Sequence, residues 1–476
     1  MTIDTSRLSD ASEDFATILA RFACSLHIEA MPADAIEEAK NNVFDTLSCA
    51  VAGSTAKGIG ELREIAVEWG GAPQATILVS GEKVPAHHAA WVNGAMAHAR
   101  DYDDTHDSAV LHAGVSVVPA ALAAAEWRFG SKGTDFLAGV VAGLETICRL
   151  GVATKIGIVD SGYMYTSLFG YFAATVAAGR VLGLSEAEMV NALGIVYSQV
   201  AGNHQVTRDG ALTKRMQPGF AAKAALVSVQ LAMRGIRGTQ NTFEGLDGFF
   251  RVYLQNKVDL GALRDGLGER FEMRGLSYKP YPCCRFNHTS IEAVLSLAES
   301  KQIHPSLVER IRVGVTRQAF EAVCTPVDVR KAPKTLVHAQ FSIPYTVAVA
   351  LVDGCVGLTH FTDAAIRRED ILQIAKRVEP YIDEQIERDW SRSVSPSNLQ
   401  IEMMDGTSFA TRIDLPLGHP DRPMSAADSD WKARDCFYHA AMPLGSDSST
   451  LLRSLVKDVE TLEDVRAIVK AITFAG

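Results

Sequence analysis

The sequence lacks the cysteine patterns of a metal-binding or redox protein. Its 8 cysteines are scattered along the chain, and the one cluster is Cys283-Cys284. No CxxC pair occurs, and adjacent cysteines rarely bind one metal ion because their side chains point in different directions. We therefore expect reduced and mostly buried thiols, with no zinc or iron–sulfur site.

Nucleotide- and nucleic-acid-binding patterns are missing as well. Neither a Rossmann nor a Walker glycine pattern is present, and residues 235–238 (GIRG) are typical of a turn that ends a helix. The net charge is -10 and no basic stripe occurs, whereas nucleic-acid-binding proteins usually carry a basic surface. We expect no cofactor and no nucleic-acid partner. An anionic substrate is compatible with the negative net charge, because a pocket can be locally basic on an acidic protein.

Long hydrophobic runs are also lacking. The first 15 residues are polar and have neither the basic nor the apolar region of a secretory signal. The longest apolar stretches, 140–144 and 343–352, are too short or too interrupted to span a bilayer. Hydrophobic residues make up 47% and charged residues 21%, as in ordinary globular proteins. We expect a cytoplasmic protein without membrane contact.

Most of the first 270 residues have the pattern of buried helices. Pro32 suits the start of a helix, apolar residues recur at helical spacing over 35–51, and Gly53 is expected to end it. Such helices are apolar on nearly every face, which favours a large bundle or an oligomer interface. Further Ala-rich helices are predicted at 88–99, 117–128, 136–149, 169–182, 186–201 and 220–234.

The pattern becomes mixed beyond Gly275. Residues 308–315 alternate like a half-buried strand, and 399–404 and 408–415 form a predicted hairpin around Asp405-Gly406. Helices are predicted at 290–299, 341–352, 368–377, 425–437 and 446–458. We predict a mainly α protein with an α+β part. Its domains are a helical domain (1–273), an α+β lid domain (274–415) and a C-terminal return to the helical domain (416–476).

A dense polar cluster interrupts the helical region. Residues 101–107 (DYDDTHD) contain Asp101, Thr105 and His106, and His112 follows shortly after. Such groups are costly to bury unless they are paired or used in chemistry. A solvated loop with a helix cap, a metal site and a catalytic cluster all remain open interpretations. The spacing matches no standard metal pattern, so we assign no metal.

Two further segments combine cations with apolar surroundings. Lys214 and Arg215 lie between His204 and an Ala-rich helix, where they could bind a carboxylate or be surface charges. Residues 278–288 (YKPYPCCRFNH) lie at the predicted domain boundary, and their prolines stiffen the run. Lys279 and Arg285 suit an anion clamp there, because ligand sites favour domain junctions.

Together these segments resemble the MmgE/PrpD family. The resemblance rests on DYDDTH at 101–106 with HAG at 112–114 and PAALAAAE at 119–126. It extends to KPYPCC at 279–284 with His288, to AQFSIPY at 339–345, and to GHP at 418–420 with Lys432 and Phe437. These motifs are distributed over nearly the whole chain.

The resemblance implies a large helical domain, a smaller α/β lid domain, a homodimer, and a cofactor-free site in the cleft between the domains. The family includes 2-methylcitrate dehydratases, cis-aconitate decarboxylases and an iminodisuccinate epimerase. By similarity to the decarboxylase-type site, the matching catalytic positions are Asp101, Thr105, His112, Lys214 and Lys279. His112 matches after a shift of one residue in its loop.

Two positions depart from the family pattern. Met164 stands where many members carry a histidine, between Tyr163 and Tyr165, and Cys284 replaces the histidine of the decarboxylases. These changes argue against cis-aconitate decarboxylation, and they also weaken the similarity to methylcitrate dehydratases.

The resemblance and the residue types together suggest a role for each candidate. His112 is the first candidate acid or base, oriented by Asp101, with Thr105 donating a hydrogen bond and Tyr163 or Tyr165 as the second acid or base. Lys214, Arg215, Lys279 and Arg285 would bind substrate carboxylates, and His106, His204, Met164 and Cys284 would line the substrate site.

We expect a lyase of the dehydratase type, acting on a small anionic di- or tricarboxylic acid by proton abstraction next to a carboxylate. An epimerase of a dicarboxylate is the first alternative, and a non-catalytic helical binding protein is the second.

Overall fold

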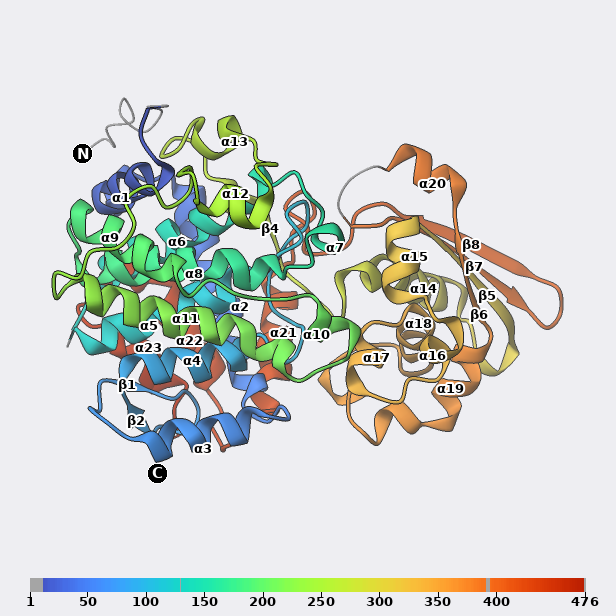
Figure 1. Cartoon of the computed structure of the whole chain (residues 1–476). Helices are drawn as coiled ribbons and strands as arrows, with labels where there is room; N and C mark the ends of the chain where they lie inside the picture. The colour runs from blue at the N-terminus through green and yellow to red at the C-terminus, as the bar shows by residue number, and fades with distance from the viewer. Residues whose placement is uncertain (1–11, 129, 391–393, 475–476) are drawn as a thin grey trace. The chain divides into compact units, whose positions relative to one another are not determined.

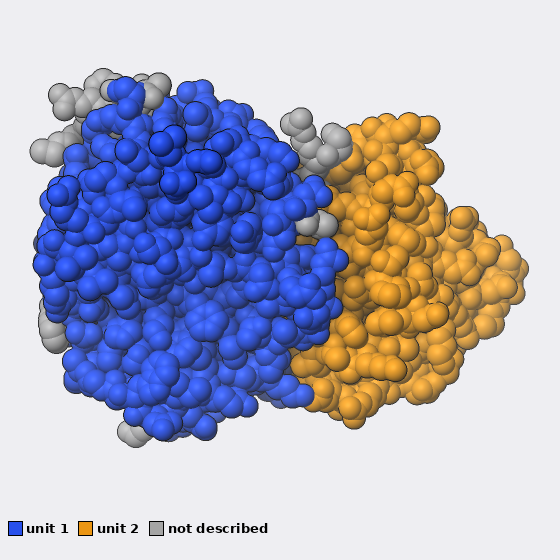
Figure 2. All heavy atoms as spheres, viewed as in Figure 1, with its two compact units in different colours: residues 1–99, 103–276, 436–476 blue, residues 100–102, 277–435 orange. Residues whose placement is uncertain are grey.

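The chain divides into two compact units (Figure 2). The computed structural model describes residues 12–128, 130–390 and 394–474, so the polar segment 1–11 lies outside the described residues. Unit 1 comprises Met1–Ala99, Asp103–Leu276 and Cys436–Gly476, and unit 2 comprises Arg100–Tyr102 and Ser277–Asp435. Unit 2 thus extends past residue 415, where the sequence-based division ends.

Unit 1 is a helical assembly, and the predicted fold class, mainly α with an α+β part, is confirmed. Helix α2 begins directly after Pro32 and ends at Gly53, as predicted. Helices α4, α5, α6, α8 and α11 pack against one another at its centre (Figure 1). The longer helices are α1 (Phe15–Ser25), α2 (Ala33–Gly53), α3 (Ile59–Trp69), α4 (Ala86–Ala97), α5 (Gly114–Trp127), α6 (Gly133–Ala153), α8 (Tyr165–Leu182), α9 (Glu186–Tyr197), α11 (Thr213–Ala232) and α22 (Ser448–Lys457).

Small residues allow the central helices of unit 1 to approach closely. A Cβ atom at Gly143 of α6 would lie 2.9 Å from the carbonyl oxygen of Ala173 in α8. At Gly139, one turn earlier, it would lie 2.8 Å from the carbonyl oxygen of Ala177. Larger side chains would push the two helices apart, so these glycines set the α6–α8 distance.

Helix α6 is longer than the sequence pattern predicts. By length and composition alone its 21 residues could cross a membrane, but 94% of its most apolar window is buried inside the protein. That burial is typical of a core helix, and α6 also carries the buried ion pair of Glu145 and Arg149. No other helix among the described residues is long and apolar enough to span a bilayer.

The C-terminal segment is built into unit 1. The backbone of Thr473 forms a parallel bridge with Val79. Gly133 N donates to the carbonyl oxygen of Leu462 over 2.8 Å, and the Lys40 ammonium lies 2.7 Å from a carboxylate oxygen of Glu460. These contacts join the last residues to the first half of the chain.

Unit 2 contains a four-stranded sheet in the order β6-β5-β7-β8. Strands β5 (Val308–Val315), β7 (Ser397–Met403) and β8 (Ser408–Ile413) are antiparallel neighbours, and β7 and β8 form the predicted hairpin around Asp405-Gly406. Strand β6 (Val378–Ile382) pairs parallel with β5 and was not predicted. Helices α14 (His288–Lys301) and α18 (Ile343–Asp353) pack against the apolar residues of this sheet.

The Glu145–Arg149 pair gives a stability prediction. Both side chains are 0% exposed, and Arg149 Nε lies 2.6 Å from Glu145 Oε1. Arg149 also donates to the carbonyl oxygens of Leu263 and Arg270. Replacing it leaves a buried, unpaired carboxylate, so Arg149→Met should destabilise unit 1 by roughly 3–5 kcal/mol.

Urea unfolding followed by circular dichroism measures this effect. The matched control is Arg466→Met, because Arg466 pairs with Asp464 at the surface with 39% of its side chain exposed. Its loss should cost less than about 1 kcal/mol. Equal midpoints for the two variants would contradict a structural role for the buried pair.

Candidate functional site

The centre of the candidate site in unit 1 is a buried carboxylate shared by two imidazoles. Asp103 Oδ2 lies 2.8 Å from His98 Nδ1 and 2.9 Å from His112 Nδ1. The two rings meet edge to face, with centroids 4.7 Å apart. His98 directly follows α4, and His112 lies just before α5, so the ends of two core helices hold both rings.

The hydrogen-bond partners define which nitrogen of each ring carries a hydrogen. His112 Nδ1 faces only acceptors, since it also lies 2.7 Å from the carbonyl oxygen of Asp104, so Nδ1 carries the hydrogen. Its Nε2 has no partner among the described residues. His98 donates from Nδ1 to Asp103, and its Nε2 accepts from the Lys214 ammonium at 3.4 Å.

Burial and neighbouring charges fix the protonation of this group. Burial, with further contributions from Lys214 and His112, lowers the pKa of His98 to about 4, so His98 is neutral near pH 7. Burial alone would raise the pKa of Asp103, but the two imidazoles outweigh it and hold that pKa well below its usual range. Asp103 is therefore an anion between two donors.

Asp104, the next residue, has a structural role. Its carboxylate accepts from the backbone N–H groups of Ala113 and Gly114 over 2.7 and 3.0 Å, which caps the first turn of α5. Burial and the charge of Asp103 raise the pKa of Asp104. A side chain at Gly114 would collide with Thr46 and Asp104, so a glycine is required at this contact.

A hydrogen bond ties the loop of His112 to the segment that holds the predicted residues 163–165. Thr166 at the start of α8 accepts a hydrogen bond from His112 N over 3.0 Å, which places residues 163–165 next to this loop. His204 N donates to the carbonyl oxygen of Gly162, and Thr207 Oγ1 lies 3.8 Å from the sulfur of Met164. Burial, with Arg208 and Lys214 nearby, lowers the pKa of His204.

Other predicted residues of unit 1 form hydrogen bonds with groups outside the His98–Asp103–His112 trio, apart from Lys214. Thr105 Oγ1 donates to Asp107 over 2.7 Å, and His106 contacts Ser108 at 3.2 Å. Tyr165 is buried and donates from its hydroxyl to the carbonyl oxygen of Ile156. Arg215 donates to the carbonyl oxygen of Lys57, whereas its neighbour Lys214 reaches His98.

Tyr163 is half-buried, and its ring packs on that of Tyr253 with centroids 5.3 Å apart. The ring of Tyr165 is also packed, on Phe169 with centroids 5.0 Å apart, so the two tyrosines differ in the hydrogen bond of the Tyr165 hydroxyl and in burial.

Within unit 2, two of the predicted residues meet at Asp101. The buried Lys279 ammonium lies 3.2 Å from Asp101 Oδ1 and donates to the carbonyl oxygen of Asp101 over 3.0 Å. Gln340 donates to the carbonyl oxygen of Arg100, and Lys432 to that of Tyr102. Three of the four sequence motifs thus supply side chains that hold segment 100–102.

Arg285 lies in the same unit. It donates from Nη1 to the carbonyl oxygen of Leu417 over 2.8 Å and lies 3.2 Å from His288 Nδ1. Burial, Arg285 and Lys279 together hold the pKa of His288 well below its usual range. Cys284 is half-buried, and its backbone N–H donates to the carbonyl oxygen of Gln340.

The spacing of His98, Asp103 and His112 also permits a metal ion, because one ligand atom from each lies within 4.8 Å of the others. The direct N···O distances of 2.8 and 2.9 Å are hydrogen-bond lengths, and a metal ion would have to displace both Nδ1 hydrogens. The Lys214 ammonium, 3.4 Å from His98 Nε2, opposes a second cation. The trio therefore fits proton transfer better than metal binding.

Comparison with known proteins identifies the family. A model of the MmgE/PrpD N-terminal domain matches residues 17–260, and a model of the MmgE/PrpD C-terminal domain matches residues 281–442. The chain belongs to the MmgE/PrpD family.

Similar individual proteins are named as lyases. A cis-aconitate decarboxylase of Aspergillus terreus is 26% identical over 86% of this chain and 86% of its own length. The human cis-aconitate decarboxylase is 25% identical over 96% of this chain and 93% of its own length. These similarities support an enzyme of the lyase class at the level of the family, without specifying a substrate.

Sequence reasoning did not include His98 and Asp103 among the site residues. His98 ends an Ala-rich helix that resembles core, and Asp103 is one of several acids in its run. A usable signal was the spacing, since Asp103 follows His98 by five positions and precedes His112 by nine within one short loop.

The low pKa of His98, about 4, predicts a pH-dependent stability. An unfolded histidine takes up a proton near pH 6.5, so between about pH 6.5 and about pH 4 the unfolded chain binds one more proton at this position than the native fold does. Stability from His98 is therefore lost as the pH falls through this window. The wild type should lose up to roughly 3 kcal/mol more than His98→Gln does.

Urea midpoints measured across this window test the difference. His27→Gln, a change at an exposed histidine, is the control and should retain the wild-type slope. Identical slopes for the wild type and His98→Gln would show that His98 is not held neutral.

Proposed function

We propose that this protein is a cofactor-independent lyase that moves a proton at a carbon next to a carboxylate of a small di- or tricarboxylic acid. The observation that carries the proposal is the state of His112. Its Nδ1 is fixed on Asp103, its Nε2 has no partner among the described residues, and its side chain is 14% exposed while Asp103 is 0% exposed. His112 is thus the member of the trio that a substrate can reach.

The arrangement suits proton abstraction from a weak carbon acid. His112 Nε2 takes the proton, and the imidazolium that forms keeps its Nδ1 hydrogen on the Asp103 carboxylate. The electron pair left on carbon moves into the adjacent carboxylate as an enediolate, which needs nearby cations. Lys214 supplies a cation beside the trio, since its ammonium lies 3.4 Å from His98 Nε2.

His98 and Asp103 are positioning residues in this proposal. Neutral His98 links Lys214 to Asp103, so the ammonium and the carboxylate are held in one hydrogen-bonded chain. Tyr163 is the preferred second acid, because the hydroxyl of Tyr165 is engaged by a backbone carbonyl. Lys279, Arg285 and the remaining candidates of the family pattern stay predictions to be tested by substitution.

Loss of water after proton abstraction is the first reaction we propose. Loss of carbon dioxide is the second candidate, because the similar proteins are named cis-aconitate decarboxylases. In that reaction carbon dioxide leaves first and His112, starting as the imidazolium, returns a proton to the carbanion. A homodimer, as the family resemblance implies, and a cytoplasmic location, as expected from the polar start of the sequence, complete the proposal.

The decisive variant is His112→Gln. It keeps a hydrogen-bonding side chain but removes the acid–base nitrogen, so solvent deuterium incorporation into the substrate or product should fall by roughly 10²–10⁴-fold. Lys214→Met should lose roughly 10²–10³-fold, because one stabilising contact to the developing charge disappears. His27→Gln is the matched control and should keep full activity.

The assay uses purified protein, no added cofactor, and a panel of citrate-type tricarboxylates, cis-aconitate and aspartate-derived diacids. Dehydration gives an ultraviolet-absorbing alkene, decarboxylation gives carbon dioxide, and epimerisation gives deuterium exchange without a change of compound. Unchanged exchange in both His112→Gln and Lys214→Met would refute the assignment of the site.

Chelation tests the absence of a metal requirement. Because the trio is joined by hydrogen bonds and flanked by Lys214, we expect turnover to survive dialysis against EDTA within experimental error. A drop of tenfold or more that zinc or another divalent ion restores would instead assign His98, Asp103 and His112 as metal ligands.

A further inference from the structure

His204 has a buried ring nitrogen without a partner, close to the candidate site. Its Nδ1 is buried without a hydrogen bond, and neither ring nitrogen bonds to any residue that the structure describes. Burial, with Arg208 and Lys214 nearby, lowers the pKa of this ring, so His204 is neutral near pH 7. One nitrogen of a neutral imidazole carries a hydrogen, so His204 has a donor to offer to an acceptor.

Two hydrogen bonds from one side chain hold the residue before His204. Asn203 N donates to Gln217 Oε1 over 2.8 Å, and Gln217 Nε2 donates to Asn203 O over 3.2 Å. The buried amide of Gln217 thus pairs with this backbone as a residue of a neighbouring strand does. The Asn203 side chain in turn accepts from Val206 N over 3.3 Å at the start of α10 (Gln205–Arg208).

The loop is fixed on both sides of Asn203. His204 N donates to the carbonyl oxygen of Gly162 over 2.8 Å, and Ser167 Oγ donates to that of Ala201 over 3.3 Å. Gly202 has a φ of 132°, and a Cβ atom there would lie 2.8 Å from the Cβ of Ser167. Only glycine fits this approach, and the loop backbone is therefore preorganised.

The start of α8 connects the loops of His204 and His112. Thr166 accepts from His112 N over 3.0 Å, and the next residue, Ser167, bonds to the loop of His204. Two adjacent hydroxyl groups therefore hold the two histidine loops side by side within unit 1.

Helix α11 connects the same loop to the trio. Gln217 follows Lys214 by three positions, so the two side chains lie on one face of this helix. The Lys214 ammonium lies 3.4 Å from His98 Nε2. The helix that presents a cation to the trio thus also fixes the backbone beside His204.

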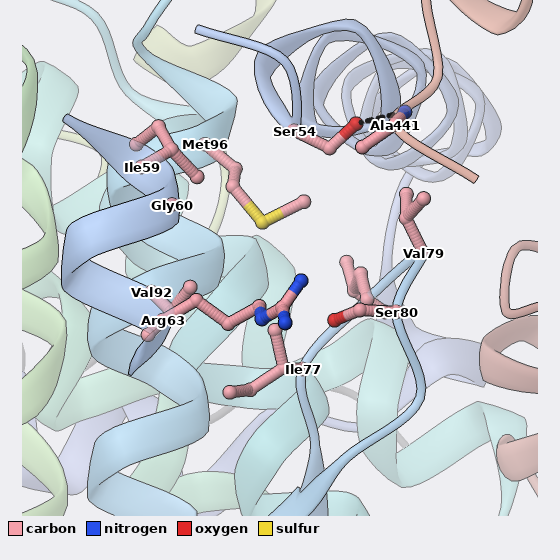
Figure 3. Close-up of a pocket in the computed structure, with 11 residues that line it drawn as sticks. Ser54, Ile59, Gly60, Arg63, Ile77, Val79, Ser80, Val92, Met96 and Ala441 are labelled. Atoms are coloured by element: carbon pink, nitrogen blue, oxygen red, sulfur yellow. Dashed lines mark hydrogen bonds between the residues drawn. The ribbon is translucent and has the colours of Figure 1, made fainter. Parts of the chain in front are cut away.

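The small cavity in Figure 3 lacks these features. It lies between α3, α4 and the turn that joins β1 (Ala75–Thr76) to β2 (Lys83–Val84), and it has room for roughly one or two water molecules. Arg63 reaches into it from α3, but Glu82 Oε1 lies 3.3 Å from Arg63 Nε. The cavity therefore offers a ligand neither space nor an unpaired charge.

We propose that Gln217 is a positioning residue that holds His204 beside Lys214, where the imidazole donates a hydrogen bond to a carboxylate of the substrate. This inference rests on the proposed function. Lys214 supplies the charge that attracts the carboxylate, and His204 supplies a directional donor. The ligand also satisfies a ring that has no other partner, which a buried polar group requires.

The test follows the His204 ring by NMR in the full-length protein, with His204→Gln assigning its signal. Tricarballylate, a tricarboxylate without a hydroxyl group or a double bond, is the probe and should shift this signal saturably. Gln217→Met has a similar volume but cannot bind Asn203, so it should weaken tricarballylate binding roughly tenfold. The pKa of His204 should rise toward the ordinary histidine value in this variant, because the ring moves away from Lys214 and Arg208.

A double variant separates positioning from a general structural role. If Gln217 acts through His204, Gln217→Met combined with His204→Gln should bind tricarballylate no more weakly than His204→Gln alone. Ser167→Ala loosens the same loop from α8 and should change binding and the ring pKa in the same direction, by less. Gln74→Met is the matched control and should behave as the wild type, because Gln74 Oε1 accepts from Ala86 N elsewhere in unit 1.

Three outcomes overturn the inference. The first is a wild type without a saturable shift, and the second is a Gln217→Met variant with unchanged tricarballylate affinity and unchanged His204 pKa. The third is a double variant in which the losses of the two single variants add. Tricarballylate binding needs no turnover, so a wild type that binds it through His204 but converts no acid of the panel would contradict the proposed reaction and support this carboxylate contact.

Discussion

A carboxylate that is wholly removed from water must be compensated by donors, and Asp103 imposes this requirement on unit 1. Two imidazole N–H groups meet one of its oxygens, and each ring is held where a core helix ends or begins. The geometry of α4, the loop after it and the start of α5 therefore depends on one buried charge. The same compensation leaves one ring nitrogen of His112 available for chemistry.

Adjacent acids in this loop have different roles because their surroundings differ. Asp103 accepts hydrogen bonds from two imidazole rings, and Asp104 caps a helix by accepting from backbone N–H groups. Asp101, in unit 2, forms an ion pair with the Lys279 ammonium. Asp101 has a positive φ of 54°, a strained conformation for a residue other than glycine. Lys279, Gln340 and Lys432 bind the backbone around it, so much of the family pattern positions this short segment.

The spacing of apolar residues along the sequence was sufficient to predict most helices and strands of the fold. Strand β5 has the predicted bounds, and α2 starts and stops at the proline and glycine that the sequence offers. Strand β6 was missed because it is five residues long and contains Pro380, which weakens a strand pattern, and because parallel pairing with β5 is a long-range contact. His98 and Asp103 were missed for a related reason. The spacing of His98, Asp103 and His112 was the local signal, but spacing alone does not distinguish a histidine at the end of an apolar helix from a core residue, and the folded loop is what brings the side chains together.

The return of the C-terminal segment to unit 1 affects how the chain can fold during its synthesis. Unit 2 is complete once Asp435 has been made, whereas unit 1 still lacks the residues that contact Lys40, Val79 and Gly133. Unit 1 therefore keeps part of its apolar surface uncovered until residues 436–476 are available, whereas unit 2 needs only the chain up to Asp435. Chaperone demand during translation should accordingly centre on the helical unit.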